Sequence, residues 1–202
     1  MGGHFFFARR KNRRREFLPL SSSLVTPKSD VLMPSRTLSH PAVLSSAALL
    51  DRLLLLREKG KRFVFTNGCF DILHPGHVDL LARAKALGDI LILGLNSDAS
   101  VKRLGKGTDR PLNPFAVRAF VAAHLACVDF VTEFDEDTPL ELIRAVRPHV
   151  LVKGGDWPPE RIVGRDLVEA DGGTVHSLPL IPGYSTTALI TRIRSGSAPQ
   201  AL

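Results

Sequence analysis

From Ser45 onward, short apolar runs alternate with longer segments whose apolar residues have helical spacing. Strands that alternate with helices are typical of a parallel sheet covered on both faces, and near-continuous Val, Ile and Leu runs fit strands buried on both sides. The pattern therefore predicts an α/β fold with a doubly wound, five-stranded parallel sheet. The expected strands are 62–66, 90–95, 130–132, 150–152 and 174–177.

The segments between these runs predict the helices. Ser45 or Ser46 can cap a first helix, which ends near Lys59, just before Gly60. Further helices are expected at 76–87, 98–104, 114–125, 138–146, 160–171 and 186–194. Because open parallel sheets bind ligands beyond the carboxyl ends of their strands, the loops that follow the strands are expected to form the functional site.

The net charge of +7 is concentrated in the first 40 residues, which contain eight Lys or Arg and two acidic residues. Residues 1–40 are interpreted as a disordered basic tail or as a misannotated extension before a true start at Met33, and 41–202 as the folded domain. The stretch 14–18 resembles a twin-arginine export signal, but the segment after it is short and polar.

No run approaches the ~20 apolar residues of a membrane span. Two cysteines give neither a disulfide framework nor a metal-site spacing, and a cytoplasmic protein is expected.

The basic tail also leaves open a nucleic-acid-binding protein, whose binding would depend steeply on salt. The nearly neutral remainder of the chain and its lack of interleaved aromatic residues argue against this class. A dinucleotide-binding site is excluded because no G-x-G-x-x-G follows the first strand.

Two histidines, a proline and a glycine stand where the first strand passes into a helix, in His74-Pro-Gly-His77. Pro75 suits the first turn of a helix, and Gly76 lets a phosphate approach the backbone closely. His74 and His77 are three residues apart, so both can face one spot beside N–H groups that favour an anion. The motif predicts a phosphate site; a zinc site would need further ligands, and the other histidines are scattered.

The stretch 68–77 resembles the signature of the HxGH nucleotidylyltransferase superfamily. These enzymes transfer a nucleoside monophosphate from a nucleoside triphosphate to a phosphate-bearing acceptor and release pyrophosphate. The segments 95–98, 101–106, 110–114, 152–157 and 184–187 fall in the order expected of its D-glycero-β-D-manno-heptose 1-phosphate adenylyltransferases. The resemblance covers roughly 44–195. It implies a Rossmann-like fold, AMP transfer from ATP to the heptose 1-phosphate for surface-glycan synthesis, Mg²⁺ bound mainly through ATP, and a homodimer. It also implies the stand-alone form of an activity that bacteria often fuse to a sugar kinase.

The resemblance assigns roles to individual residues. Catalytic roles fall to His74, His77, Lys106 and Arg118. Nucleotide-binding roles fall to Thr66, Asn67, Gly68, Phe70, Gly76, Asn96, Asp98, Lys102, Lys153, Gly154, Ser185, Thr186 and Thr187. Acceptor-binding roles fall to Asp71 and Asp156.

Several of these residues have a second interpretation. Lys102 and Lys106 suit the leaving pyrophosphate but also fit a solvated charge run, and Arg118 suits a bidentate phosphate contact but also a helix surface. Asp98 can cap a helix, and Asp71 can hold a turn. Ser185 can be an ordinary helix cap, and core packing is expected for Trp157, the single tryptophan.

A cytidylyltransferase acting on a polyol or amino-alcohol phosphate is the alternative within the superfamily. Those enzymes usually carry an arginine shortly before the Ser-Thr-Thr motif. The preceding stretch 178–184 has none, which favours adenylyl transfer.

Overall fold

The computed structural model describes residues 38–105, 107, 109–155 and 157–196. Most of the predicted tail, Lys106 and Asp156 lie outside the described residues. Residues 37–202 form one compact unit.

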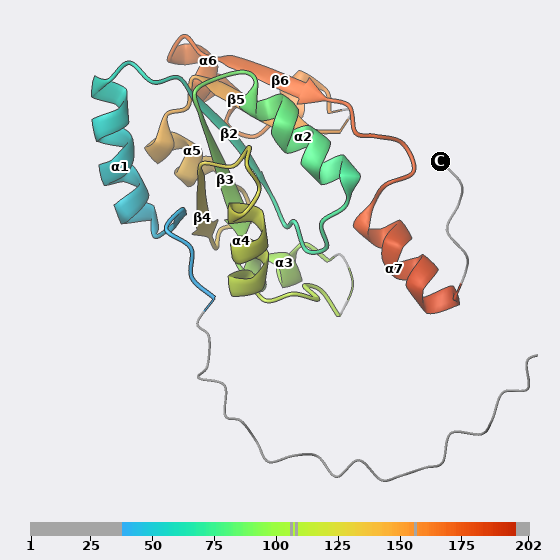
Figure 1. The fold of residues 1–202 in the computed structure, drawn as a ribbon. Coiled ribbons are helices and arrows are strands. Elements are labelled where there is room, and N and C mark those ends of the chain that lie inside the picture. Colours follow the sequence, from blue (N-terminus) through green and yellow to red (C-terminus); the bar gives the residue numbers. More distant parts are fainter. Residues whose placement is uncertain (1–37, 106, 108, 156, 197–202) are drawn as a thin grey trace, which may run out of the picture. The chain divides into compact units, whose positions relative to one another are not determined.

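The sheet has six strands, all parallel, in the order β1-β4-β3-β2-β5-β6 (Figure 1). The strands are β1 (Val43–Leu44), β2 (Phe63–Gly68), β3 (Ile90–Asn96), β4 (Phe130–Phe134), β5 (Val150–Gly154) and β6 (Thr174–Leu178). The five predicted strands are confirmed, but the predicted strand count is wrong. Val43 and Leu44 add a sixth strand beside β4, and two residues are too few to show a strand period.

The helices are α1 (Ser46–Glu58), α2 (Pro75–Lys85), α3 (Asp98–Arg103), α4 (Phe115–Ala123), α5 (Leu140–Val146), α6 (Arg165–Ala170) and α7 (Thr186–Ser195). Ser45 caps α1, as predicted, by accepting the Ala48 N–H. The predicted helix 160–171 is wrong in its first half, where a single 3-10 turn (Pro159–Arg161) precedes α6. Gly164 separates the two with φ +86°, a left-handed conformation that interrupts a helix.

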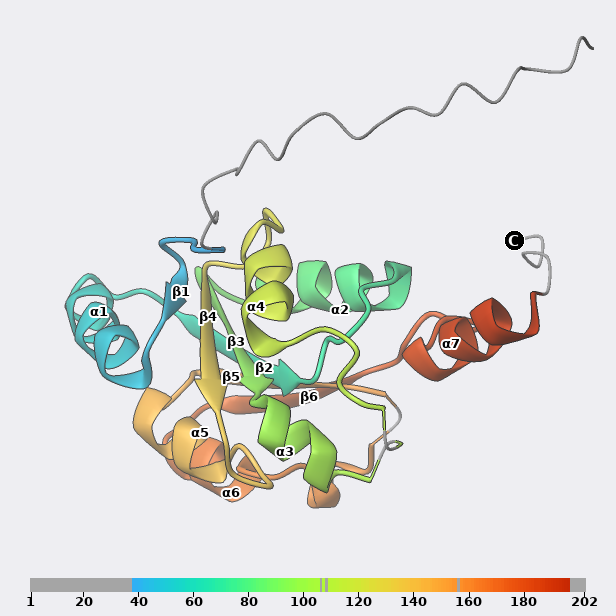
Figure 2. The same cartoon turned by 90° about the horizontal axis from the view of Figure 1, so that it is seen from below.

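Alternate side chains of the sheet enter two apolar cores. In β2, Val64 packs with α2 and α4 on one face, whereas Phe63 and Phe65 pack with α1, α5 and α6 on the other. Figure 2 shows α2 and α4 on one side of the sheet and α5 and α6 on the opposite side. Because both faces are covered, the strands are fixed and their carboxyl ends form a rigid base for the loops.

The strand order reverses between β2 and β5, which are neighbours in the sheet. The chain leaves β2 toward α2 on one face and leaves β5 toward α6 on the other, so the two loops diverge at the carboxyl edge. Such a switch point is where open α/β sheets bind ligands. Within the described part of the chain, no helix has the length and apolar character needed to cross a membrane.

One histidine makes the stability of this sheet depend on pH. The Phe63 N–H, at the start of β2, donates to Nδ1 of the half-buried His149 at 2.9 Å, so the ring must be neutral at Nδ1. Burial, and then the charges of Arg57 and Arg62, lower the pKa of His149 below 6.5. The unfolded chain therefore binds this proton more readily, so the stabilisation is present above about pH 6.5 and is lost as the pH falls below it.

We accordingly expect the free energy of unfolding, measured by urea denaturation, to fall between about pH 7 and about pH 5. His149→Asn offers an acceptor that takes up no proton, and it should flatten part of this fall. Burial lowers the pKa of His74 as well, so some of the slope should persist in the variant. A pH profile that His149→Asn leaves unchanged would contradict this role.

Candidate functional site

The two histidines of the motif lie side by side at the start of α2. Pro75 is the first residue of the helix, and His74 precedes it in an extended conformation. The imidazole rings of His74 and His77 stack with centroids 3.8 Å apart. The Phe70 ring lies 4.7 Å from His77, and the Tyr184 ring lies 6.5 Å from His74. The pair is thus held between two aromatic rings, one after β2 and one before α7.

His74 is a buried residue. It is 7% exposed, and burial lowers the pKa of its imidazole. Among the described residues, Nδ1 of His74 has no hydrogen-bond partner. A Cβ on Gly76 would lie 3.2 Å from this nitrogen, so a larger residue at this position would crowd the ring against the first turn of the helix. The site therefore holds a polar ring atom at the start of a helix, where an anion is favoured.

A cavity of about 490 Å³ opens beside the two rings, and we name it the histidine cavity. Its walls come from the end of β2 and the start of α2, from the loop after β5, and from the start of α7, which lies next to the start of α2 in Figure 1. The lining residues are Asn67, Gly68, Cys69, Phe70, Asp71, His74, His77, Leu80, Arg110, Lys153, Gly154, Trp157, Leu180, Tyr184, Ser185, Thr186 and Thr187. Ser185 caps α7, accepting the Ala188 N–H at 3.0 Å, which agrees with the alternative interpretation of this residue. Two helix N-termini therefore border one cavity, which suits a polyanion.

A second cavity of about 310 Å³, which we name the apolar cavity, shares part of its wall with the first. The shared residues are Asn67, Gly68, Cys69, Lys153 and Trp157. Its other walls are Asn96, Leu104, Asp137, Thr138, Pro139, Leu151, Arg161, Ile162 and Val163. Leu151 and Ile162 belong to the core on the face opposite α2. The two cavities thus lie on opposite sides of the end of β2.

Trp157 borders both cavities, so its predicted burial in the core is wrong. It is 46% exposed, and its indole Nε1–H donates to the Gly154 carbonyl at 3.1 Å. Lys153 Nζ lies 6.0 Å from the centre of the indole and donates to Asn67 Oδ1 at 3.5 Å. The turn at Gly155, with φ +110°, carries the tryptophan out of the strand and over the cavities.

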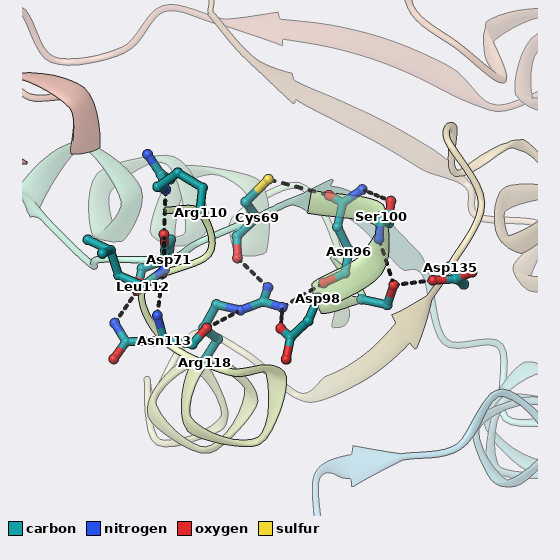
Figure 3. Close-up of polar contacts among 11 residues, drawn as sticks. Cys69, Asp71, Asn96, Asp98, Ser100, Arg110, Leu112, Asn113, Arg118 and Asp135 are labelled. Atoms are coloured by element: carbon teal, nitrogen blue, oxygen red, sulfur yellow. Dashed lines mark hydrogen bonds and ion pairs between the residues drawn. The ribbon is translucent and has the colours of Figure 1, made fainter. Parts of the chain in front are cut away.

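A buried ion pair anchors the loop before α4 (Figure 3). The Asp71 carboxylate accepts from Arg110 Nε at 2.5 Å and from the backbone N–H groups of Leu112 and Asn113 at 2.9 and 2.8 Å. The side chains of Asp71 and Arg110 are 0% and 6% exposed. Asp71 therefore holds a loop, which is the structural one of its two predicted roles.

Arg118 differs from both of its predicted interpretations. Its side chain is 0% exposed, and its guanidinium donates to the carbonyls of Asn113, Cys69 and Asn96 at 3.0, 2.7 and 2.8 Å and to Asp98 Oδ1 at 2.7 Å. Four of its five N–H groups thus have protein acceptors, which leaves no bidentate face for a phosphate. Asp98 pairs with Arg118, and Ser97 rather than Asp98 caps α3.

Three further predicted residues do not line the histidine cavity. Asn96 lines the apolar cavity but is 4% exposed and donates to Ser100 Oγ. Thr66 is buried within β2, and its hydroxyl has no partner among the described residues. Lys102 is exposed on α3 and does not appear among the described residues that line either cavity.

Sequence reasoning missed the positions of Arg110, Tyr184 and Trp157 in the cavity walls. Each lies in a stretch that resembles the superfamily, and this resemblance was the only available signal. Nothing in local spacing indicates that Arg110 pairs with a residue 39 positions earlier.

Comparisons with known proteins point to one family. The family model described as cytidylyltransferase-like matches residues 65–192. The "Bifunctional protein HldE" of Geotalea uraniireducens is 53% identical over 163 residues, which is 79% of this chain and 33% of that protein. The protein of the same name from Syntrophotalea carbinolica is 58% identical over 146 residues, 72% of this chain and 30% of that protein. This chain spans about a third of the length of these curated relatives.

Among solved structures, the lipopolysaccharide core biosynthesis protein from Thermoplasma volcanium matches with a TM-score of 0.50 and 26% identity, covering 60% of this chain and 98% of that one. The family match begins within β2 and ends within α7. It therefore includes the stacked histidines and the start of the last helix, which together border the histidine cavity. The chain belongs to the cytidylyltransferase-like family of nucleotidyltransferases.

Proposed function

We propose that the protein transfers AMP from ATP to D-glycero-β-D-manno-heptose 1-phosphate, giving ADP-heptose and pyrophosphate. The observation that carries nucleotidyl transfer is that the stacked rings of His74 and His77 line the same cavity as the start of α7. The N-termini of α2 and α7 therefore border this cavity together. The choice of heptose is supported by the sequence resemblance, by the relatives named HldE and by the lipopolysaccharide core biosynthesis protein of similar fold.

In this proposal the triphosphate occupies the histidine cavity. The imidazoles of His74 and His77 donate to oxygens of the α- and β-phosphates, and the start of α7, with Ser185 and Thr186, binds the β- and γ-phosphates. An oxygen of the acceptor phosphate attacks the α-phosphorus as the bond to the β-phosphate oxygen breaks, and pyrophosphate leaves. A phosphate is already anionic, so no protein nucleophile is required. Catalysis is positioning and stabilisation of charge on the transferring and leaving groups.

We propose that the acceptor sugar phosphate occupies the apolar cavity. In-line displacement requires the acceptor to approach from the side opposite the leaving pyrophosphate. The apolar cavity lies across the end of β2 from the histidine cavity and shares Asn67 and Lys153 with it. Lys153 is thus placed to reach an acceptor phosphate at the boundary, and Trp157 covers the sugar.

The resemblance supplies the other parts of the proposal. Lys102 and Lys106 would bind the leaving pyrophosphate, and Asp156 the acceptor. Mg²⁺ would arrive with ATP and, when bound, neutralise charge on its phosphates. Among the residues that the structure describes, no group of three or more His, Cys, Asp or Glu could hold a metal ion. We also propose a homodimer that acts in the cytoplasm.

Pyrophosphate release tests this function directly. We expect release with ATP and D-glycero-β-D-manno-heptose 1-phosphate together, and background release with either alone. CTP with glycerol 3-phosphate or phosphocholine gives the matched test of the cytidylyltransferase alternative. Release with CTP and a polyol phosphate, in place of ATP and the heptose phosphate, would overturn the proposal.

Deletion of residues 1–37 tests the nucleic-acid-binding alternative. The shortened protein should keep the turnover of the full chain, whereas a protein that binds nucleic acid through this tail would lose its affinity for nucleic acid.

Trp157 supplies a specific test of the acceptor site. It is the only tryptophan in the chain, so its fluorescence reports on one place, and we expect the emission to change when the heptose phosphate is added. Trp157→Ala should raise the acceptor KM about tenfold, through loss of about 1.4 kcal/mol of aromatic contact. Leu54→Ala, at an exposed position of α1, is the matched control and should leave KM unchanged. An unaltered acceptor KM in Trp157→Ala would place the acceptor elsewhere.

A further inference from the structure

The peptide that follows β2 has a fixed orientation. The Cys69 carbonyl accepts a 2.7 Å hydrogen bond from Arg118 Nη1, and the Cys69–Phe70 peptide is trans. In a trans peptide the carbonyl and the next N–H point in opposite directions. The Phe70 N–H therefore points away from Arg118. Cys69 and Phe70 line the histidine cavity, and Arg118 is not among the residues that line it.

Phe70 also has an unusual backbone conformation. Its φ is +46°, a left-handed conformation that residues other than glycine rarely adopt. Within the described part of the chain, its N–H has no hydrogen-bond acceptor. Such a conformation persists where the surroundings impose it, and it is common at ligand-binding sites. The structure thus presents an available donor next to the two histidine rings.

Arg118 is itself held on every side. Its guanidinium binds the carbonyl of Asn96 at the end of β3, the Asp98 carboxylate, and the carbonyl of Asn113 in the loop before α4 (Figure 3). That loop is tied to Asp71, in the same segment as Phe70, by the Asn113 N–H and amide group. The planar fork therefore connects the ends of two strands through hydrogen bonds of fixed direction.

We propose that Arg118 is a positioning residue, which holds the Cys69 carbonyl so that the Phe70 N–H is preset as a donor to a phosphate oxygen in the histidine cavity. The inference rests on the proposed function and deepens it, because it adds a backbone donor to the two imidazoles. A donor that is oriented before the reaction costs no reorganisation as charge develops, and loss of one such donor typically reduces kcat about 100- to 1,000-fold.

The sequence allows the Phe70 N–H to be observed alone. Cys69-Phe70 is the only Cys-Phe pair in the chain, since Cys127 is followed by Val128. Labelling cysteine carbonyls with ¹³C and phenylalanine amides with ¹⁵N therefore gives one carbonyl-linked amide signal in the full-length protein. We expect this amide proton to move downfield when a nonhydrolysable ATP analogue is added to the wild type. Arg118→Lys keeps the charge, but its three donors sit on a single nitrogen and do not span the three carbonyls that Nε, Nη1 and Nη2 reach, so the shift should be lost.

Kinetics provide the second readout. Arg118→Lys should reduce kcat about 100-fold with a much smaller change in the KM for ATP. The matched control is Arg57→Met, since Arg57 holds the carbonyls of Val146 and Arg147 away from both cavities and should affect stability but not kcat. Asp98→Asn changes a half-exposed residue and weakens the hold on the Arg118 guanidinium, so it should reduce kcat by a smaller factor. This variant keeps the inference testable if Arg118→Lys does not fold.

The amide signal and the kinetics distinguish a failure of the positioning role from a failure of the proposed function. A wild-type protein that releases no pyrophosphate with any acceptor overturns the proposed function. An active wild type whose Phe70 signal does not respond to the analogue overturns the positioning role alone. The same conclusion follows if Arg118→Lys keeps wild-type kcat or shows the full wild-type shift.

Discussion

His77→Ala is expected to fold normally and to lose about 100- to 1,000-fold in kcat, which corresponds to about 2.7–4 kcal/mol of the barrier. The His77 ring stacks on His74 and lies against Phe70, at the start of α2, where the transferring phosphate is placed in our proposal. Its removal takes away a donor to the phosphates. Turnover is measured by pyrophosphate release, and stability by urea denaturation of the same sample.

The stability cost of His77→Ala should be small, because the lost ring contacts are worth about 0.5–1.5 kcal/mol. His124→Ala is the matched control, since His124 is exposed at the end of α4, its ring Nδ1 contacts the Phe120 carbonyl, and it is not among the residues that line either cavity. It should leave kcat unchanged. Near-normal turnover in His77→Ala, or an equal loss in His124→Ala, would contradict the role of the histidine pair.

Asp71→Asn is expected to destabilise the fold by about 3–5 kcal/mol, because it leaves the buried Arg110 guanidinium without its counter-charge. The carboxylate also accepts two backbone N–H groups of the loop before α4, and an amide offers only one acceptor oxygen in place of two. The free energy of unfolding from urea denaturation measures this loss.

Two further variants make the ion-pair effect specific. Asp71→Asn combined with Arg110→Met removes both charges, and it should be more stable than Asp71→Asn alone. Glu141→Gln breaks an exposed pair with Arg144, and it should cost less than about 1 kcal/mol. If Asp71→Asn is as stable as Glu141→Gln, the buried pair does not anchor the loop.

Most of the fold was predictable because its signals are local. Strands β2, β3 and β5 begin with continuous apolar runs, and Ser45 and Ser185 are caps that act within one helical turn. The exceptions are also physical. β1 is only two residues long and is defined by its pairing with β4, and the segment before α6 bends at a glycine in the left-handed region.

The site was predictable where its residues are close in sequence. His74 and His77 can stack because residues three positions apart at the start of a helix lie on the same side of it. The burial of Arg118 was not predictable, since a helical arginine is usually at the surface. This burial depends on carbonyls at the ends of two strands and in one loop. Trp157 is exposed because a turn carries it over the cavities, which apolar character alone does not indicate.

A crystal structure with a nonhydrolysable ATP analogue tests most directly whether the histidine cavity binds the triphosphate. We predict ring nitrogens of His74 and His77 within about 2.7–3.2 Å of oxygens on the α- and β-phosphates, with the γ-phosphate at the start of α7. A triphosphate bound away from these rings, or rings turned from it into the core, would contradict the account.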